Sequence, residues 1–378
     1  MTQAVFADRI GKSKSWVEKA ERGERSAGRL SVLDEICEVL QVSVSMLIGE
    51  ESGRSIDTCL DDSEVGRIRS ALERYAFHTA ERSPADAESL GRRLDHAWAA
   101  FEFADYQVMG RVLPELLEDA QLAHAALGSQ ESATVLAGVY QVIASTLRKL
   151  GEYTLAWLAG DRGVAVAQGA GDLAAGAGAG FRIANALLSM GRAGQALALN
   201  LSLADRLQQD GSGEELRALH GHVLLQAAMA AAVSGDDATV AALIGEARDL
   251  TRFVSGGTNH YRLAFGPVNV TLHEVAAMVA LGENGRAVQV ADSLGGDGVR
   301  LLRRERRAAL MVDTARACSQ AGRRDEAVRR LLAAEETAAP EVRCRPVAQA
   351  TIADLLHRSR GAPPLELARL AERAGVRP

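Results

Sequence analysis

Aromatic residues are scarce in this chain of 378 residues: Phe, Trp and Tyr together make up 4%. Ala, Leu, Gly and Arg dominate instead, a mixture that favours helices packed closely on small side chains. Lysine is also sparse, because only Lys12, Lys14, Lys19 and Lys149 are lysines among 43 basic residues. The formal net charge of −6 excludes a protein that binds nucleic acid over its whole surface, so any DNA contact has to be local.

Cysteines are few and far apart. Cys37, Cys59, Cys318 and Cys344 form no CxxC pair, and no His/Cys cluster has the spacing of a zinc site. We therefore expect no metal, no cofactor and no disulfide framework, and a reducing cytoplasm fits best. No apolar run approaches the roughly 18 residues needed to cross a membrane, and the N-terminus lacks a secretory signal, so a soluble cytoplasmic protein is expected.

Motifs of the common enzyme classes are missing. The sequence contains no GxGxxG after a strand, no GxxxxGK[ST], no GxSxG and no HExxH, and the dipeptide His273-Glu274 lacks a second histidine. We therefore expect the protein not to be an enzyme.

Short helical segments fill the first 50 residues. Thr2 can cap a helix over residues 3–10, and Gly11 ends it at a turn. Ser13 can cap a second helix over residues 14–22, whose inner face includes Val17. Ser31 with Asp34 forms a capping-box pattern that opens a third helix. The pattern predicts a small helical domain over residues 1–50.

Signature residues of one DNA-binding fold occur at matching places in this segment. They are Gln3, Ala7, Gly11, Val17 and Glu21. The segment thus resembles helix-turn-helix domains of the phage-repressor, or xenobiotic-response-element, type. The resemblance implies that Ala7 lets two helices approach, that Gly11 makes the turn and that Val17 locks the second helix onto the first.

The same resemblance places the helix over residues 14–22 in the major groove of DNA. Lys14 and Ser15 then become base readers, while Arg9, Lys12 and Arg22 mainly hold phosphates. The full set of expected DNA-binding residues is Gln3, Arg9, Lys12, Ser13, Lys14, Ser15, Trp16, Glu18, Lys19 and Arg22. Residues 1–29 carry seven Lys/Arg against four Asp/Glu, the local positive patch that DNA binding requires. The alternative is that these charges merely solvate a helical surface.

Domains of this type have one more helix before the one that begins at Gln3. In the family that helix packs over the apolar residues at Phe6, Ile10, Val17 and Leu33. We therefore expect that the true start lies upstream, that another surface covers this face, or that the reader is degenerate.

A different pattern follows a connector over residues 51–86, in which one helix is expected from about Ser63 to Thr79. Over residues 87–378 a glycine recurs with an alanine five positions later, at Gly151/Ala156, Gly191/Ala196, Gly282/Ala287 and Gly322/Ala327, and Gly235 is in register but has Val240 in place of the alanine. An earlier hairpin, with Trp98, Phe101, Phe103 and Tyr106 leading to Ala126, starts the array. Such spacing indicates stacked helix hairpins. The segments resemble degenerate tetratricopeptide repeats, which implies an all-α fold in which a right-handed solenoid follows the helix-turn-helix domain.

One face of the first helix in each hairpin is unexpectedly polar. Its positions lie thirteen, nine and six residues before the marker glycine, and they hold Arg182, Asn185, His222, Gln226, Asn269, His273, Asp313 and Arg316. In such solenoids the first helices line the concave surface, so the first six of these side chains are candidates to bind a peptide or a small polar effector. The alternative is a face that is polar simply because it is solvated. Residues 255–267, the longest interruption, form either a lid over this groove or a plain connecting loop.

The order of the domains, reader first and repeats after, resembles the peptide-responsive quorum-sensing regulators of Gram-positive bacteria, and the Arg-, Ala- and Gly-rich composition resembles actinobacterial proteins. The resemblance implies a transcriptional regulator that binds a DNA operator as a homodimer on an inverted repeat. It further implies that an effector held by the repeats alters the spacing of the two readers. The alternative is a protein–protein interaction scaffold with a degenerate helix-turn-helix.

Overall fold

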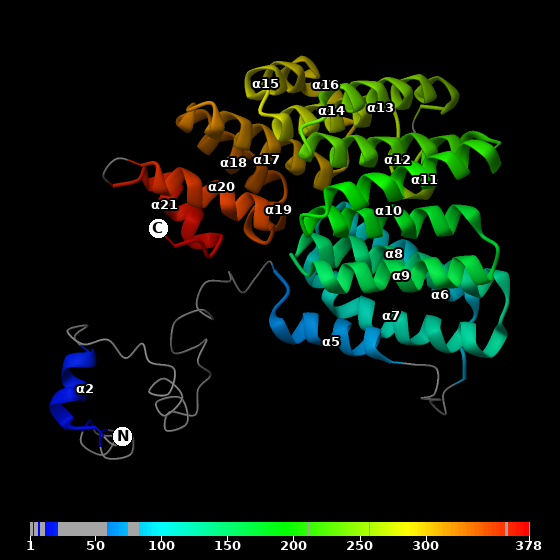
Figure 1. The fold of residues 1–378 in the computed structure, drawn as a ribbon. Helices are drawn as coiled ribbons and strands as arrows, with labels where there is room; N and C mark the ends of the chain where they lie inside the picture. The colour runs from blue at the N-terminus through cyan, green and yellow to red at the C-terminus, as the bar shows by residue number, and fades with distance from the viewer. Residues whose placement is uncertain are drawn as a thin grey trace. The chain divides into compact units, whose positions relative to one another are not determined.

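The computed structural model describes residues 3, 7, 12–21, 59–74, 83–210, 212–256, 258–359 and 362–377. The chain divides into two units, Met1–Arg54 and Ser55–Pro378. Within the described residues the fold is all-helical and contains no strand (Figure 1). The expected all-α class is confirmed.

The first unit contains helix α2 (Lys14–Glu21), which begins where the sequence predicted. Ser13 caps it, because the Trp16 amide donates to Ser13 Oγ over 3.1 Å. Ala7 and Val17 are both buried, at only 2% exposure. The Lys12 amide also donates to the carbonyl oxygen of Ala7 over 2.9 Å, which ties the start of α2 to the segment before it.

The second unit opens with helix α5 (Asp62–Glu73), the helix expected in the connector. A capping box between Asp61 and Glu64 starts it one residue before the predicted position. Its buried side chains include Ile68 and Leu72, which pack in the same core as α7. The helix of the connector is therefore part of the second unit and not a free linker.

Consecutive helices of this unit pack as pairs joined by short turns (Figure 1). The pairs are α6 (Ala87–Glu102) with α7 (Tyr106–Leu127), α8 (Gln130–Lys149) with α9 (Tyr153–Gly169), α10 (Leu173–Ser189) with α11 (Ala193–Asp210), α12 (Glu214–Val233) with α13 (Asp237–Leu250), α14 (Pro267–Leu281) with α15 (Asn284–Ser293), and α17 (Arg304–Gln320) with α18 (Arg324–Thr337). The remaining described helices are η2 (Thr251–Phe253), η3 (His260–Arg262), α16 (Gly295–Arg300), α19 (Ala339–Arg343), α20 (Pro346–His357) and α21 (Leu365–Arg373).

A glycine in the left-handed region ends the first helix of five pairs. The φ angles are 88°, 79°, 76°, 82° and 77° at Gly151, Gly191, Gly235, Gly282 and Gly322. Glycine reaches this region at little steric cost, so the chain can reverse there without strain. Five residues later a small side chain is fully buried, at Ala156, Ala196, Ala287 and Ala327. The turns that the sequence predicted are confirmed at these positions.

The two ends of the second unit meet. Helix α6 contacts α17, and Ala104 joins Ala308 and Ala338 in a small apolar cluster. The hydroxyl of Tyr106 donates to the carboxylate of Glu341. Figure 1 shows the C-terminal helices curling back beside α8 and α10. The first helices therefore surround an interior space.

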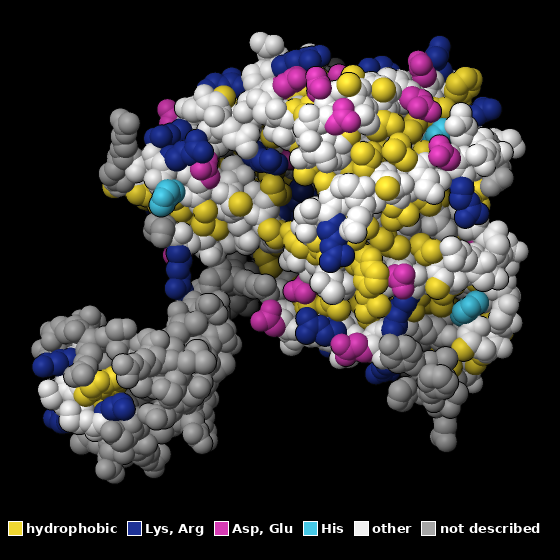
Figure 2. Space-filling view, in the orientation of Figure 1, with side chains coloured by type: hydrophobic (Ala, Val, Ile, Leu, Met, Phe, Trp, Pro, Cys, Tyr) yellow, Lys and Arg dark blue, Asp and Glu magenta, His cyan; other side chains and the backbone are white. Residues whose placement is uncertain are grey.

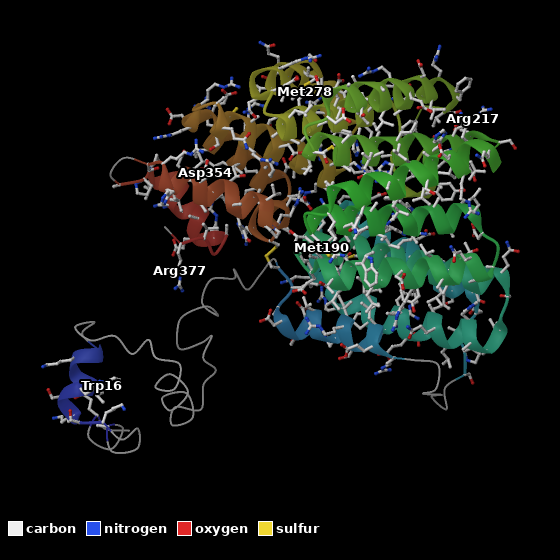
Figure 3. All side chains as sticks on the ribbon, viewed as in Figure 1. Trp16, Met190, Arg217, Met278, Asp354 and Arg377 are labelled. Carbon is white, nitrogen blue, oxygen red and sulfur yellow. A yellow bond between two sulfur atoms is a disulfide. The ribbon has the colours of Figure 1, made fainter. Side chains whose placement is uncertain are left out.

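Cys59 and Cys344 form a disulfide, visible as a yellow bond in Figure 3, with an S–S distance of 2.02 Å and a Cα–Cα distance of 5.6 Å. It joins the residues before α5 to the turn between α19 and α20, 285 residues later in the chain. The expectation that no disulfide forms was wrong, because sequence spacing does not show which distant residues meet when the unit closes. Cys318 is buried and free.

One described stretch, His260–Leu281, is long and apolar enough to cross a membrane, with a mean hydropathy of 1.3. This corrects the expectation that no run approaches that length. Within the best window 56% of the stretch is buried, and α14 packs against α12, α15 and α17. In this structure it is a core helix.

Candidate functional site

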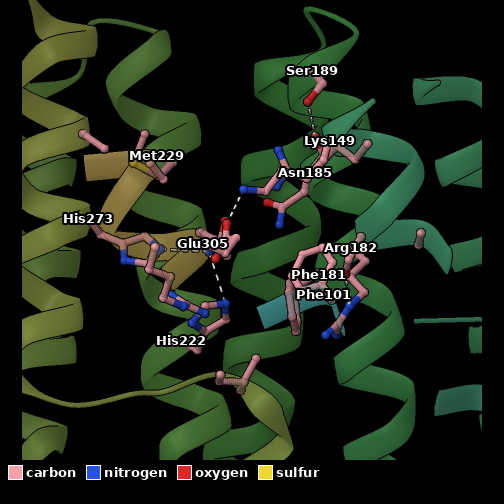
Figure 4. Close-up of a pocket in the computed structure, with 18 of the residues that line it drawn as sticks. Phe101, Lys149, Phe181, Arg182, Asn185, Ser189, His222, Met229, His273 and Glu305 are labelled. Carbon is pink, nitrogen blue, oxygen red and sulfur yellow. Dashed lines mark hydrogen bonds and ion pairs between the residues drawn. The ribbon is translucent and has the colours of Figure 1, made fainter. Parts of the chain in front are cut away.

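An interior cavity of about 260 Å³ lies among the first helices of the pairs (Figure 4). Helices α6, α8, α10, α12, α14 and α17 form its wall, together with the connection before α14 and Arg345. Within the described part of the chain, α9, α11, α13, α15 and α18 contribute no lining residue. Figure 2 shows Lys and Arg side chains inside a hollow between the C-terminal helices and the middle of the unit.

The cavity wall follows the polar register that the sequence analysis identified. Five of the six expected effector-binding residues line it, namely Arg182, Asn185, His222, Gln226 and His273. Asp313, at the same register in α17, lines it too, whereas Arg316 does not. The structure therefore brings these side chains together from four successive hairpins.

Three of these polar side chains are buried away from solvent. Arg182 is 6% exposed, His222 is 3% exposed and His273 is 7% exposed. The alternative of a solvated face is therefore wrong for these three residues. Polar groups at such burial cost free energy unless hydrogen bonds compensate them, so their retention in the interior needs a reason.

Asn269, the sixth expected residue, lies behind the wall. It is 1% exposed, its Nδ2 donates to the carbonyl of Leu263 over 3.1 Å, and its Oδ1 accepts from Arg306 Nη1 over 2.7 Å. Both ends of the carboxamide are used inside the protein. Asn269 therefore positions Arg306 and the connection before α14, and it does not face the cavity.

A buried charged cluster closes one side of the cavity. Lys149 donates to Glu305 and, over 2.8 Å, to Glu341 Oε2. Arg345 Nη1 donates to the same Glu341 oxygen over 2.9 Å. Burial raises the pKa of Glu305, but Lys149 and Arg306 outweigh it, and the pKa falls to about 2. Glu305 is thus a carboxylate that is already paired.

A second, uncharged network crosses the cavity between α12 and α14. Gln226 Nε2 lies 3.2 Å from His222 Nε2 and 3.1 Å from His273 Nε2. His273 Nδ1 lies 2.8 Å from the carbonyl oxygen of Asn269, so this ring nitrogen is the donor. Burial, and then Arg306, lower the pKa of His273 to about 4, so the ring is neutral.

In this network, His222 has a ring nitrogen that forms no hydrogen bond with a described residue. Burial lowers its pKa well below the ordinary value, and His273 and Arg306 lower it further, so His222 is also neutral. Because the amide of Gln226 donates to its Nε2, the proton of His222 lies on Nδ1. That buried N–H has no hydrogen-bond partner among the described residues. It is a donor left unused in the wall of the cavity.

The connection before α14 forms part of the wall. Arg262 and Leu263 line the cavity, and Arg262 Nη2 pairs with Asp95 of α6 over 2.5 Å. Asn259 Nδ2 donates to Glu102 over 2.9 Å. Arg262 and its neighbours Tyr261 and Ala264 have φ angles of 61°, 51° and 48°, a region that costs side chains other than glycine free energy. Contacts to α6 therefore hold a strained segment across the cavity, and its opening as a lid stays a prediction.

Sequence reasoning missed the main cations of the site. Arg148, Lys149, Arg306 and Arg345 all line the cavity. One signal was available, because the polar register continues one turn further to the position two residues before the marker glycine. That position holds Lys149 before Gly151, and Lys149 is the only lysine after residue 19.

The expected DNA-binding residues lie in the first unit. Ser13, Lys14, Ser15 and Lys19 are exposed, as is Gln3, while Lys12 and Trp16 are half-buried. Glu18 lies in α2, but its side chain is not described. The predictions for Arg9 and Arg22, and for the faces of Phe6 and Ile10, fall outside the described residues. Exposed polar side chains and the buried Val17 thus occupy different faces of α2.

In the described part of the chain, no group of three or more His, Cys, Asp or Glu side chains is arranged to hold a metal ion. Comparisons of the chain with protein-family models, with curated proteins and with solved structures found no match.

Proposed function

We propose that this chain is a DNA-binding transcriptional regulator whose helical second unit senses an effector. The observation that carries the DNA-binding part is the division of α2, which buries Val17 and exposes Lys14, Ser15 and Lys19. A helix capped by Ser13 and divided in this way suits insertion into a major groove. Its positive charge supplies the local contact that the acidic chain otherwise lacks.

The sensing part rests on the interior cavity. In our proposal the second unit is a right-handed solenoid of tetratricopeptide-like hairpins, closed on itself so that the concave face becomes a chamber. An effector held by several first helices would favour one curvature of the array over another. Two readers in a homodimer would then change their spacing on an inverted repeat.

Selection of DNA from a random pool by the full chain tests the proposal. We expect a specific site, bound at least about 1,000-fold more tightly than random DNA of the same length. The double variant Lys14→Ala/Lys19→Ala should lose that preference. Arg252→Ala is the matched control, because Arg252 is an exposed basic residue of the second unit and is 70% exposed beside Asp249.

Failure to enrich any sequence would contradict the proposal and favour the alternative of an interaction scaffold with a degenerate helix-turn-helix. Enrichment that survives the double variant but fails in Arg252→Ala would place DNA binding elsewhere in the chain.

A further inference from the structure

Three guanidinium groups face the cavity without a carboxylate partner among the described residues. Arg182 Nε donates to Ser145 Oγ over 2.9 Å, and its Nη1 donates to a backbone carbonyl. Arg306 donates to the amide oxygen of Asn269. The guanidinium of Arg148 also lines the cavity and forms no hydrogen bond or ion pair with a described residue, although the charges of Glu305 and Glu341 act on it from further away. Arg182 is buried, and Arg148 and Arg306 are half-buried. This lack of carboxylate partners is unusual, because charges that are largely removed from water are normally paired in proteins.

The other three cations of the cavity wall, in contrast, are paired with carboxylates. Lys149 and Arg345 share Glu341, and Arg262 pairs with Asp95. In the cavity wall, Glu305 forms its ion pair with Lys149, and its charge acts on Arg306 without forming an ion pair with it. Six cations line the cavity, and four acids oppose them: Glu305 and Asp313 in the wall, and Glu341 and Asp95 behind it. The wall therefore carries an uncompensated positive charge.

The three unpaired groups also repel one another. Burial, and then the charges of Arg148 and Arg306, lower the pKa of Arg182 to about 9. The Arg182 guanidinium is fixed in place, since its Cζ lies 4.4 Å from the ring centre of Phe181 and 5.1 Å from that of Trp98. Like charges held together in a desolvated space destabilise the empty protein, and an anion placed among them would remove that cost.

Uncharged polar groups on the cavity wall can also donate hydrogen bonds to an anion. The unused N–H of His222 is a donor, and the carboxamide of Asn185 lines the cavity with no side-chain hydrogen bond to a described residue. Apolar side chains complete the wall, including Phe101, Met229 and Leu272. A volume of about 260 Å³ is slightly below the usual range of roughly 300–1,000 Å³ for ligand pockets, so it suits a small molecule.

We propose that the cavity binds a small organic anion, whose phosphate or carboxylate group is held by Arg148, Arg182 and Arg306 and whose remainder packs on the apolar wall. Guanidinium groups bind both kinds of oxyanion by charge-assisted hydrogen bonds. The inference rests on the proposed function only for the role of the ligand as the effector of a regulator. Anion binding itself is measured without DNA, so its failure and a failure of DNA binding are distinguishable.

Thermal unfolding of the full chain in sodium phosphate, sodium malonate and sodium chloride at matched ionic strength tests the proposal. We expect the Tm to rise saturably with phosphate or with malonate and not with chloride, because a ligand that binds only the folded state stabilises it. The anion with the larger effect at equal concentration identifies the preferred group, phosphate or carboxylate.

Arg148→Gln is the decisive variant, because Arg148 has no described partner to lose. It should raise the Tm in chloride by removing a half-buried charge that repels Arg182, and it should weaken the anion effect at least about tenfold, the equivalent of one charge-assisted bond. Arg345→Gln is the matched control: this cation lines the same cavity but is paired with Glu341, so its loss should lower the Tm in chloride.

Three results would overturn the proposal. The first is a Tm that neither phosphate nor malonate raises beyond the chloride reference. The second is an anion effect of equal size in Arg148→Gln, and the third is a lower Tm of that variant in chloride, which would show that Arg148 is a structural cation.

Discussion

Lys149 Nζ lies 2.8 Å from Glu341 Oε2, although 192 residues separate them in the chain. Glu341 is fully buried, and Lys149 is 4% exposed. Because Lys149 also binds Glu305, one ammonium group joins α8 to both α17 and α19. This contact holds the two ends of the second unit together and thereby closes the cavity.

Replacing Lys149 should show how much this contact contributes to the stability of the folded chain. Lys149→Met leaves Glu305 and Glu341 buried with less compensation, and we expect the free energy of unfolding to fall by about 3–5 kcal/mol. Urea unfolding measures it. Arg252→Ala, at an exposed ion pair, should change the value by less than about 1 kcal/mol. A loss as small in Lys149→Met as in this control would show that the cluster does not hold the ends together.

The disulfide should contribute to the same closure. Cys59→Ser opens a loop of 285 residues, and we expect the free energy of unfolding to fall by about 2–4 kcal/mol under non-reducing conditions. With a reducing agent present, the wild-type chain and the variant should unfold alike. Peptide mapping checks the bond, and a wild-type chain that shows no Cys59–Cys344 linkage, or a variant of unchanged stability, would contradict this assignment.

Stability should fall in acid over a defined window. His273 has a pKa of about 4 in the folded chain, whereas its ordinary value is 6.5. Below pH 6.5 the unfolded chain therefore binds a proton at this residue that the folded chain does not bind. The free energy of unfolding therefore decreases as the pH falls from 6.5 to about 4, and it does not change for this reason above 6.5.

The titration of Glu305 also decreases the free energy of unfolding as the pH falls, but it does so at lower pH. Its pKa of about 2 against 4.5 means that its stabilising contribution is lost as the pH falls from 4.5 towards 2. His273→Gln should make the upper part of the profile less steep and leave the lower part, while His222, whose pKa is also lowered, maintains the remaining slope. Unfolding curves at half-unit steps of pH give the measurement, and a His273→Gln profile that is parallel to the wild type between pH 6.5 and 4 would refute the assignment.

The first unit allows a test of base reading against phosphate binding. Lys14→Ala should cost roughly 1–3 kcal/mol at one position of the selected DNA site, whereas Lys12→Ala should weaken all sequences and lower the salt slope by about one. Fluorescence anisotropy on single-base variants of the site at several salt concentrations separates the two effects. Unchanged affinity of Lys14→Ala across the whole panel would show that Lys14 does not read a base.

The helix pairs and the inward face of the first helices were predictable from local sequence. A glycine at Gly191 or Gly282 is a local signal, because only the turn itself requires its backbone conformation. The polar register was equally visible, since residues nine and six positions before such a glycine share one face of a helix. Arg182 and Asn185, and their counterparts in the next hairpins, lie on the cavity as that register indicated.

The closure of the unit was not predictable. The contacts that make it, Cys59 with Cys344 and Lys149 with Glu341, join residues 285 and 192 positions apart and leave no periodic trace in the sequence. Without the closure, the sequence pattern predicts only an open groove that suits either a peptide or a small polar effector. Arg148 and Arg306 were not predictable as site residues for the same reason, because the lack of an ion-pair partner is unusual only in a cavity that partly buries them.

The affinity of the full chain for its selected DNA site, measured with and without the anion that stabilises it best, tests the central claim most directly. At constant ionic strength we expect the anion to change the affinity of the wild-type chain by about 5- to 150-fold, a coupling of 1–3 kcal/mol. Arg148→Gln should bind the same DNA with no response to the anion. An affinity that the anion leaves unchanged in the wild type, or changes equally in both proteins, would contradict the account of an effector-responsive regulator.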